Sequence, residues 1–527
     1  MFKNKFPAIV LLAGALAACG GAAAPVSPAP PSSSAASPSA AVSKPAAASS
    51  PSSAPSASAA AKPSAPPASA SAAPASSSAS ASASPSPAAV TIVPGKTPIQ
   101  HVVIIYQENH SFDNLYGLFP GAEGLKDAKN TVQTGPDGKP YTTLPEALNT
   151  NYKPPIPDSR IPDLPNKPFD LDQFIPQDKM TGDLVHRYYQ EQMQIDGGKM
   201  DKFAQISDAQ GLSMGYWDGT KLPLWKYAQQ YVLADHFFHA AFGGSFLNHF
   251  WLVCACTPTF PNAPANMVAK PNPDGTLALD ASGKPINDGS VTPDGFGINT
   301  MFTTYNPHPA SAAPETLVPP QTMPHIGDRL DTKKISWAWY SGGWDDAMAG
   351  KPDPLFQFHH QAFAFFKDLA DGTPAKAQHL RDEKEFMAAL KGTNTLPQVS
   401  FVKPLGPDNE HPGYANITRG DQHAADLVKA IQDSSYWKDT AIIITYDEHG
   451  GSWDDVAPPK VDRWGPGVRV PTLIISPYAK KSFVDKTVYD TTSILKFIEN
   501  NWELQPLGDR DAKVNDLTNA FDFTQKP

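Results

Sequence analysis

The stretch HVVIIYQEN, residues 101–109, joins a short apolar run to a carboxylate and an amide. The apolar part, 101–106, is too short for a core helix and is rich in β-branched residues, so it predicts a buried strand. The later stretch AIIITYDE, residues 441–448, repeats this pattern with two acidic residues at its end. Because strands of a parallel sheet present their carboxyl ends at one edge, these polar ends are expected to meet there.

The remaining apolar runs extend the same sheet. Further buried strands are expected at 335–340, 398–402 and 472–475. Helical patterns lie at 223–232, 245–255, 382–391, 421–433 and 491–501. Their alternation with the strands predicts an α/β fold with a mostly parallel central sheet flanked by helices. Two stretches rich in Pro, Gly, Asn and Asp, 120–176 and 258–324, are expected to be long loop insertions.

The first residues form a region of their own. Lys3 and Lys5, a short apolar core and the small residues before Cys19 resemble a bacterial lipoprotein signal, which predicts a signal peptide over 1–18. The resemblance implies cleavage before Cys19 and acylation of its thiol. We therefore expect an exported lipoprotein, anchored in a membrane and facing the periplasm or the cell surface. The alternative is a plain signal peptide with an incidental cysteine.

The next segment, 19–92, consists almost wholly of Ala, Ser and Pro. Such a composition cannot bury enough apolar surface to offset its ordering entropy, so we expect a disordered tether. The remaining residues, 93–527, are then one folded domain with insertions.

Charge and cysteine content exclude some classes of protein. The formal net charge is −10 at pH 7, and the sequence has no basic run, so nucleic acid is not an expected partner. Cys254 and Cys256 are two residues apart on what the pattern predicts as one helix, where a disulfide would be strained. We expect both to be buried thiols and no disulfide framework to exist. The oligomeric state is left open.

The polar strand ends suggest a cation site. Glu108 and Asn109 follow the early strand, and Asp447 and Glu448 follow the late one. Three carboxylates gathered at one edge would repel one another unless a cation neutralises them. Carboxylate and amide oxygens are the ligands that hard divalent ions prefer. Either pair alone could equally be a solvated turn or a helix cap.

The stretch AFGGSFLNH, residues 241–249, adds a hydroxyl. Its two glycines permit close approach of the backbone to a ligand, and Ser245 would begin the helix predicted from 245. A helix N-terminus favours phosphate and alkoxide groups, and Asn248 lies one turn further on the same face. Taken alone, the stretch is also what a turn followed by an N-cap serine looks like.

Four histidines stand in polar contexts, namely His186, His359, His360 and His411. Histidine can donate hydrogen bonds to phosphate oxygens and can protonate a leaving group near neutral or mildly acidic pH. A single histidine of this kind is more often structural, so a catalytic role for these four is supported only together with the other motifs.

Three ordered segments, ENHSFDN, FGGSFLNH and YDEHGG, resemble the bacterial phosphoesterase family, which holds AcpA-type acid phosphatases and phosphatidylcholine-cleaving phospholipases C. The matches run from about 101 to 502, essentially the whole predicted domain. The resemblance implies an alkaline-phosphatase-like α/β fold for 93–527 and one divalent metal ion of unknown identity. The ligands that it implies are Glu108, Asn109, Asp447, Glu448 and the Ser245 oxygen.

The same resemblance implies roles for the other residues. Ser245 would be the nucleophile that is transiently phosphorylated, and His186, His360 and His411 would be candidates for catalysis. Asn109, Asn248 and His359 would contact the phosphate ester. The first motif departs from the family where His110 stands in place of a frequent Arg, which affects the contacts behind the first metal pair.

The nucleophile segment bears on the substrate. Phospholipase C members look different there, with Thr followed three residues later by Asn-Arg, whereas this chain has Ser245 and Asn248-His249. This segment looks like that of the acid-phosphatase members, which implies hydrolysis of phosphate monoesters through a phosphoserine. A phospholipase C acting on phosphodiester lipids is the first alternative. A surface lipoprotein that binds a partner without turnover is the second.

Overall fold

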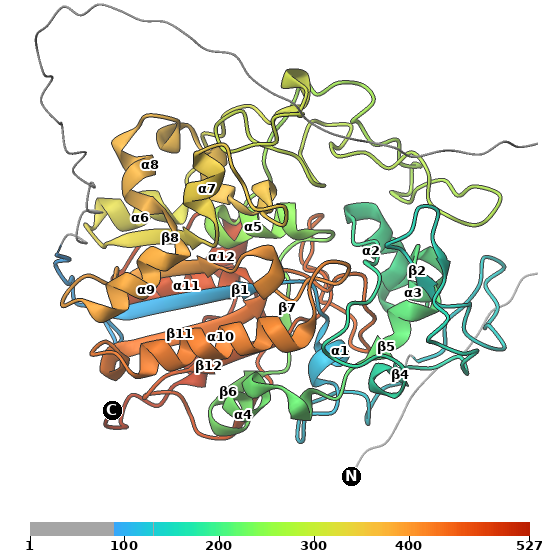
Figure 1. Ribbon diagram of the computed structural model, residues 1–527, viewed down its shortest axis with the longest axis horizontal. Helices are drawn as coiled ribbons and strands as arrows, with labels where there is room; N and C mark the ends of the chain where they lie inside the picture. Colours follow the sequence, from blue (N-terminus) through green and yellow to red (C-terminus); the bar gives the residue numbers. More distant parts are fainter. Residues whose placement is uncertain (1–88, 130) are drawn as a thin grey trace, which may run out of the picture. The chain divides into compact units, whose positions relative to one another are not determined.

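An eight-stranded sheet forms the centre of the structure, a computed structural model that describes residues 89–129 and 131–527 (Figure 1). The strand order is β13-β6-β12-β11-β1-β10-β8-β9. The strands are β1 (His101–Gln107), β6 (Val232–Ala234), β8 (Trp337–Ser341), β9 (Leu380–Asp382), β10 (Val399–Lys403), β11 (Thr440–Tyr446), β12 (Thr472–Ile475) and β13 (Phe483–Asp485).

The sheet is mostly parallel, which confirms the predicted α/β class. Within it, only the pairs β11–β12 and β12–β6 are antiparallel, whereas β1 pairs in parallel with both β10 and β11. All five predicted strands are present, with bounds that differ by at most two residues. The three-residue strands β6, β9 and β13 were not predicted, because runs of three residues are too short for a recognisable period.

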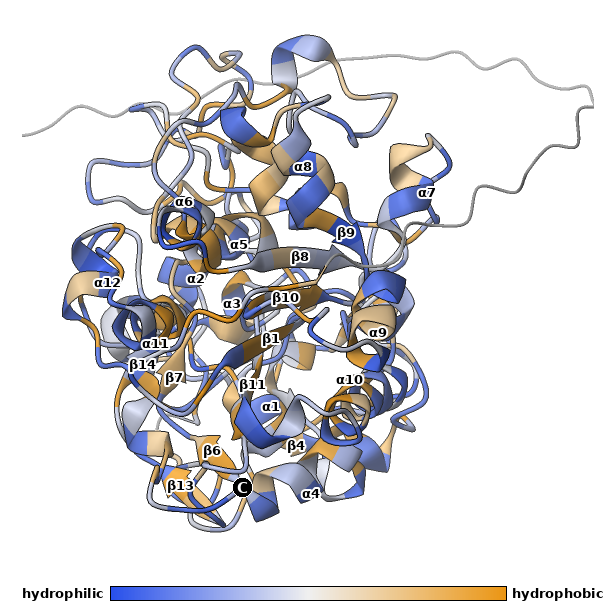
Figure 2. Cartoon of the chain, turned by 90° about the vertical axis from the view of Figure 1, so that its left-hand side faces the viewer, coloured by the Kyte–Doolittle hydropathy of each residue, from blue (hydrophilic) through white to orange (hydrophobic). Residues whose placement is uncertain are grey.

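Helices cover both faces of the sheet (Figure 2). Helices α4, α9 and α10 lie on one face, and α5, α6 and α11 lie on the other. The longer helices are α2 (Tyr188–Ile195), α4 (Pro223–Gln230), α5 (Ser245–Cys254), α6 (Ile326–Thr332), α9 (Glu383–Lys391), α10 (Ile417–Gln432) and α11 (Thr492–Trp502). The shorter ones are α1 (Phe112–Tyr116), α3 (Phe203–Ile206), α7 (Trp344–Met348), α8 (Pro374–His379) and α12 (Asp509–Lys513).

Two helix boundaries differ from the prediction for local reasons. Helix α10 begins at Ile417, four residues before the expected start, because the Asn416 side chain caps it by accepting from the Arg419 N–H. Helix α4 ends at Gln230, and Val232 already belongs to β6.

The insertions contain little regular structure. Residues 120–176 hold only the two-residue strands β2 (Leu148–Asn149), β3 (Ile156–Pro157) and β4 (Phe169–Asp170) and one short 3₁₀ turn among their described positions. Residues 258–324 hold one 3₁₀ turn at Pro314–Thr316. The other short strands are β5 (Gly215–Tyr216), β7 (Phe237–Phe238) and β14 (Tyr489–Asp490).

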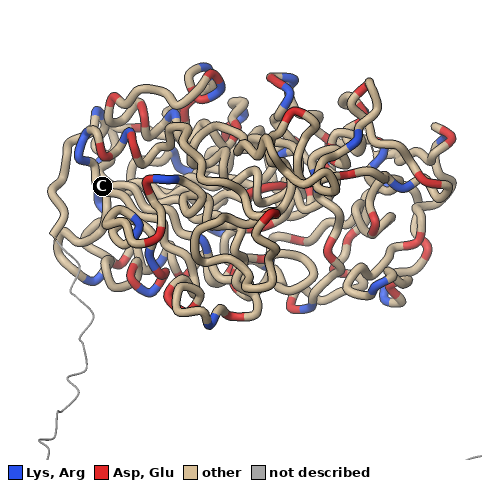
Figure 3. Tube along the Cα trace, turned by 90° about the horizontal axis from the view of Figure 1, so that it is seen from above, with Lys and Arg blue, Asp and Glu red and all other residues tan. Residues whose placement is uncertain are grey.

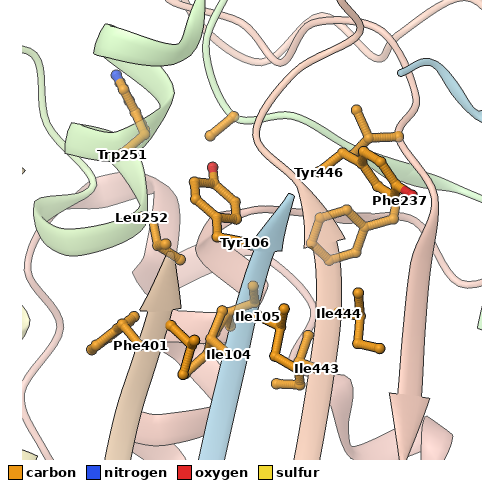
Figure 4. Close-up of a cluster of buried hydrophobic side chains, with 14 of the residues drawn as sticks. Ile104, Ile105, Tyr106, Phe237, Trp251, Leu252, Phe401, Ile443, Ile444 and Tyr446 are labelled. Carbon is orange, nitrogen blue, oxygen red and sulfur yellow. The ribbon is translucent and has the colours of Figure 1, made fainter. Parts of the chain in front are cut away.

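The core lies where β1 and β11 pair. Ile104 and Ile105 of β1 and Ile443 and Ile444 of β11 are fully buried, and Phe401 of β10 packs beside them (Figure 4). Each fully buried aliphatic side chain contributes about 1.5–3 kcal/mol relative to an exposed one. The core therefore holds the ends of β1 and β11 rigidly.

Cys254 and Cys256 form a disulfide, so the expectation of two free thiols is wrong. Helix α5 ends at Cys254, and Ala255 takes a left-handed conformation with φ 47° and ψ 37°. This turn places the two Cα atoms 5.1 Å apart, within the usual range for a disulfide. The strain argument failed because it assumed one continuous helix.

The predicted signal peptide 1–18, Cys19 and the tether up to residue 88 lie outside the described residues. Within 89–129 and 131–527, every helix is too short or too polar to cross a membrane. Acidic and basic residues are interspersed over this part of the chain (Figure 3).

Candidate functional site

The carboxyl ends of β1 and β11 meet as the sequence predicts. Gln107 and Tyr446 are register partners, and the Asp447 N–H donates to the Gln107 carbonyl at 3.0 Å. Glu108 and Asp447 are therefore neighbours at the sheet edge. One ligand atom each of Glu108, Asp447 and His360 lie within 4.8 Å of one another, and all three residues are buried.

Ser245 lies beside Asn109 and Glu448, the second residues of the two pairs that follow β1 and β11. Its Oγ is 3.4 Å from Asn109 Oδ1 and 3.5 Å from Glu448 Oε1. The structure thus brings the five predicted ligand residues into one cluster. The oxygen atoms come from three distant segments of the chain, which only the sheet topology brings together.

The conformation of Asn109 depends on the late motif. Asn109 has a φ of 76°, a left-handed value that asparagine tolerates better than most residues. Gly450 packs directly against it, and a Cβ on Gly450 would overlap the Asn109 carbonyl oxygen. Glycine at 450 is therefore required by close backbone contact between the segments that follow β1 and β11.

The two glycines before Ser245 are likewise required by close backbone contacts. Gly243 has a φ of 91°, and a Cβ there would overlap the Tyr188 backbone nitrogen. A Cβ on Gly244 would lie 2.9 Å from the His186 carbonyl oxygen. The segment 186–188 therefore packs directly against the loop that precedes Ser245, so that the serine and His186 are held together.

Asn248 differs from its predicted role as a substrate ligand. Its side chain is fully buried, Oδ1 accepts from the Ala241 N–H at 2.9 Å, and Nδ2 donates to the Ala241 and Gly243 carbonyls. The amide therefore closes the loop 241–244 onto the first turn of α5. Asn248 positions Ser245, and both groups of its amide are already hydrogen bonded.

A cavity of about 370 Å³ opens above Ser245. Three of the four predicted histidines, His186, His359 and His411, line this cavity together with Ser245. The rest of the lining is largely polar or charged, including Lys153, Asp183, Arg187, Asp208, Asn299, Thr300, Gln357 and Tyr414. Ser245 is only 4% exposed, and this cavity gives access to it.

His360 is the histidine that the cavity lining leaves out. It is buried, and its Nδ1 lies 2.9 Å from Glu108 Oε1. Its ring stacks on that of His249 with centroids 4.7 Å apart. His360 therefore holds Glu108 from behind, whereas its predicted catalytic role requires access to substrate.

Two residues that sequence reasoning missed also bind Glu108. The Lys403 ammonium forms an ion pair with Glu108 and donates to the Tyr106 carbonyl at 3.1 Å. The Tyr414 hydroxyl donates to Glu108 Oε2 at 3.0 Å. Lys403 is the last residue of β10, next to β1, so the rule that selects polar strand ends would have found it. Tyr414 does not stand at the end of a predicted strand, so the same rule would not have found it.

The electrostatics of the cluster favour a bound cation. Burial raises the pKa of Asp447 to about 7, with Lys403 opposing and Glu108 reinforcing the effect. Burial and the adjacent Asp447 hold the pKa of Glu448 well above its usual range. Burial would also raise the pKa of Glu108, but His360 and Lys403 outweigh it and hold that pKa well below the ordinary value.

The hydrogen bonds at this cluster test whether a metal would fit. Asp447 Oδ2 is buried and has no hydrogen-bond partner among the described residues. A buried carboxylate oxygen without a partner costs free energy unless a cation compensates it. Asp447, Glu448, Asn109 and Ser245 supply oxygen ligands of the kind that Mg²⁺, Ca²⁺ or Mn²⁺ prefer. The residues present therefore fit a hard divalent ion.

The other acidic cluster in these motifs is filled by an arginine. Asp113 of the first motif lies with Asp454 and Asp455, which follow the late motif by a few residues. Arg469, fully buried, binds Asp454 at 2.7 Å and Asp455 at 3.2 Å and lies 3.5 Å from Asp113. This group joins the segments that follow β1 and β11 behind the candidate site.

His110, where the family often has Arg, is also structural. Its Nδ1 lies 2.6 Å from Asn114 Oδ1 and its Nε2 lies 3.1 Å from the Glu410 carbonyl. Burial lowers its pKa to about 4. Through these two contacts, His110 links the first motif to the segment carrying His411.

Comparison with known proteins identifies similar sequences. The profile of the phosphoesterase family matches residues 99–505. A non-hemolytic phospholipase C of Pseudomonas aeruginosa is 25% identical over 471 residues, which cover 81% of this chain and 57% of that protein. The chain thus spans little more than half the length of that relative. Phospholipase C B of Mycobacterium tuberculosis is 25% identical over 480 residues, covering 82% of this chain and 79% of that one.

Solved structures give only distant matches. A protein of the alkaline phosphatase superfamily from Vibrio parahaemolyticus aligns over 56% of this chain and 64% of its own, with 11% identity and a TM-score of 0.31. The lipoteichoic acid synthase LtaP of Listeria monocytogenes aligns over 55% of this chain and 68% of its own, with 10% identity and a TM-score of 0.28. Superpositions this loose carry no argument about the site.

Proposed function

Because the chain belongs to the phosphoesterase family, we propose that it hydrolyses phosphate esters through Ser245 with the help of one divalent metal ion. One observation carries this proposal. The Ser245 hydroxyl lines the cavity and at the same time lies within 3.5 Å of oxygen atoms of Asn109 and Glu448. A hydroxyl shared between a substrate cavity and a cation site is the arrangement that an activated nucleophile requires.

Glu108, Asn109, Asp447, Glu448 and the Ser245 oxygen would hold the metal ion. When bound, a divalent ion at this place stabilises negative charge as a Lewis acid and favours ionisation of the serine hydroxyl. Ser245 is also the first residue of α5. The free N–H groups and the dipole of that helix end add to the stabilisation of a phosphate held above it.

The reaction takes two steps at phosphorus. The Ser245 oxygen forms a bond to phosphorus while the bond to the leaving alcohol breaks, and the alcohol takes a proton from a cavity histidine. Water then attacks the phosphoserine, releases phosphate and restores the serine hydroxyl. His186 Nε2 lies 3.7 Å from Glu448 Oε1. The His186 and His411 rings are neighbours in the cavity, with centroids 5.6 Å apart. These two histidines are therefore the candidates for proton transfer.

The character of the cavity supports phosphate monoesters as the first candidate substrates. Leu184 and Val185 are the main apolar residues of a lining that is otherwise polar or charged. Such a lining suits a small polar leaving group better than acyl chains. Burial and the neighbouring His360 hold the pKa of His359 well below the usual value despite the opposing effect of Glu108, so it is a neutral contact for the ester.

Phospholipase C activity is the second candidate, and the relatives favour it. The similar proteins from Pseudomonas aeruginosa and Mycobacterium tuberculosis are phospholipases C by name. Assays with p-nitrophenyl phosphate and p-nitrophenyl phosphorylcholine separate the two. A preference for the first substrate supports the monoesterase, and a preference for the second supports the phospholipase.

The nucleophile is tested on whichever substrate is turned over. Ser245→Ala is expected to lower kcat by at least about 1,000-fold, because no other group in the cavity replaces the serine oxygen. Substantial activity in this variant would refute the serine route. Absence of turnover of all phosphate esters by the metal-loaded wild type would instead support a surface-binding lipoprotein.

We also propose that Cys19, which lies outside the described residues, carries a lipid that anchors the protein in a membrane. The lipoprotein-like signal before it supports this proposal. Wild-type protein is expected to incorporate labelled fatty acid and to partition into detergent. A Cys19→Ser variant that still incorporated the label would refute it.

A further inference from the structure

We propose that the chain binds a second metal ion, with a structural role, between Glu191, His239 and His449. These residues lie on three segments: Glu191 is on α2, His239 directly follows β7, and His449 follows the metal-binding pair at the end of β11. All three side chains are fully buried. They form a group separate from the predicted ligands of the catalytic ion and take no part in the proposed reaction.

The ligand atoms are spaced as a metal site requires. His239 Nε2 lies 2.8 Å from Glu191 Oε1, His449 Nε2 lies 3.8 Å from the same oxygen, and one ligand atom of each residue lies within 4.8 Å of the others. Tetrahedral ligands at about 2.0–2.1 Å from zinc are about 3.3 Å apart, between the two measured separations. The two imidazole rings stack with an interplanar angle of 10°.

The hydrogen bonds of the histidines direct both Nε2 atoms to the centre of the cluster. His449 Nδ1 lies 2.9 Å from the Ser452 carbonyl oxygen, and only a protonated Nδ1 can donate there. His239 Nδ1 faces Asn248 Oδ1 at 3.4 Å. That amide is oriented by its donation to the Ala241 and Gly243 carbonyls, so its oxygen faces His239. With Nδ1–H as the donor in each ring, Nε2 carries the lone pair and points it at Glu191.

Lone pairs facing a carboxylate oxygen need a proton or a cation between them. A second proton on His239 would satisfy the His239–Glu191 contact. It would leave His449 Nε2 buried without a hydrogen-bond partner among the described residues. A metal ion satisfies all three groups at once. Metal-bound histidines characteristically donate their other N–H to an oxygen atom, and here both Nδ1 atoms face one.

The ligand set indicates which class of ion would bind. Two imidazoles and one carboxylate suit zinc or a similar transition metal, whereas the catalytic cluster offers mainly oxygen. Gly467 covers the group, and a Cβ there would overlap the His239 ring and Glu191 Oε1. The absence of a side chain at 467 is what leaves room beside the three ligands.

The place of this cluster explains what the ion would do. The second oxygen of Glu191 accepts from the Gly243 N–H, and Glu191 Oε1 accepts from the Val468 N–H at 3.0 Å. Gly243 belongs to the nucleophile loop, and His449 directly follows the ligand Glu448. An ion bound here would hold the loop before Ser245 against the segment that carries two ligands of the catalytic ion.

The experiment measures zinc in a protein whose catalytic centre has been disabled. The full chain with Asp447→Asn and Glu448→Gln is stripped with a chelator, dialysed against zinc and analysed for metal. We expect about one zinc per chain, and a loss of at least about tenfold when His449→Gln is added. His423→Gln, which changes a partly exposed histidine of α10 paired with Glu383, is the matched control and should keep the zinc.

A second measurement guards against misfolding of the His449→Gln protein. Zinc should raise the midpoint of thermal unfolding of the disabled protein, because a ligand that binds only the folded state stabilises it. Co(II) should give visible absorption bands typical of four-coordinate sites. No zinc uptake and no thermal shift in the disabled protein would overturn the proposal. Because these measurements do not depend on turnover, they fail independently of the proposed function.

Discussion

Gly450 and Asn109 are in direct backbone contact, although they lie on motifs more than 300 residues apart. A Cβ on Gly450, whose φ is 61°, would overlap the Asn109 carbonyl oxygen. The contact holds Asn109 in its left-handed conformation with φ 76°. Through this contact, the end of β11 controls the orientation of an amide that follows β1.

Gly450→Ala is therefore expected to displace Asn109 as well as to strain its own backbone. We expect kcat to fall by at least about tenfold, because small displacements of catalytic groups have large effects on rate. Gly350→Ala is the matched control, since Gly350 has a similar φ of 72° and a Cβ added there would have no neighbouring atom within 4 Å. Equal activity losses in both variants would contradict the contact argument.

Asp447→Asn is expected to reduce metal binding and turnover together. The substitution keeps the shape of the side chain but removes the charge of a buried ligand whose Oδ2 has no hydrogen-bond partner among the described residues. We expect kcat to fall by at least about 100-fold, because the charge balance of the centre is lost. Metal content and kcat measured on the same samples check this. A variant with full metal and full activity would remove Asp447 from the ligand set.

Arg469→Met is expected to destabilise the protein by about 3–5 kcal/mol, the usual cost of leaving buried charges unpaired. Arg469 is fully buried among Asp113, Asp454 and Asp455, and burial together with Asp454 raises the pKa of Asp455 to about 6 even in its presence. Arg463→Met removes the exposed pair with Asp294 and should cost less than about 1 kcal/mol. Denaturant unfolding of both variants gives the comparison, and similar losses would contradict it.

Glu499 should make stability depend on pH. Its carboxyl group on α11 is buried, and both oxygens lack hydrogen-bond partners among the described residues. Burial and the nearby Asp511 raise its pKa to about 9 from an ordinary value of 4.5. Between these two values the folded state retains a proton that the unfolded state has lost, so the free energy of unfolding decreases as pH rises.

Glu499→Gln should therefore unfold less readily than the wild type at pH 8 and show a smaller difference at pH 5. Thermal unfolding across this range measures the effect. Glu503→Gln changes an exposed carboxylate paired with Lys96 and should leave the pH slope unchanged. A wild-type slope that persists in Glu499→Gln would assign the pH dependence to another group.

Much of the fold follows from local pattern. The runs 101–106 and 441–446 specify buried strands because their β-branched and apolar residues suit nothing else of that length, and both strands are present. The five predicted helices are likewise present, because each has an apolar period or a recognisable start. Strands of three residues carry no such signal, and only their pairing partners define them.

The candidate site likewise has residues that the sequence predicts and residues that only the structure reveals. The rule that polar groups collect at the carboxyl ends of parallel strands found Glu108, Asn109, Asp447 and Glu448. It did not find Tyr414, whose hydroxyl reaches Glu108 across 306 positions of sequence separation. Nor did it show that Asn248 faces its own loop or that Glu191 joins two histidines behind that loop.

By itself the sequence determined which segments become strands and helices and which polar residues stand at their ends, because both depend on neighbours within a few positions. The tertiary structure alone decided which of those polar groups touch one another. It set Lys403 on Glu108 and gathered Glu191, His239 and His449. Such contacts arise when distant segments pack around one core, and a linear pattern carries no record of that packing.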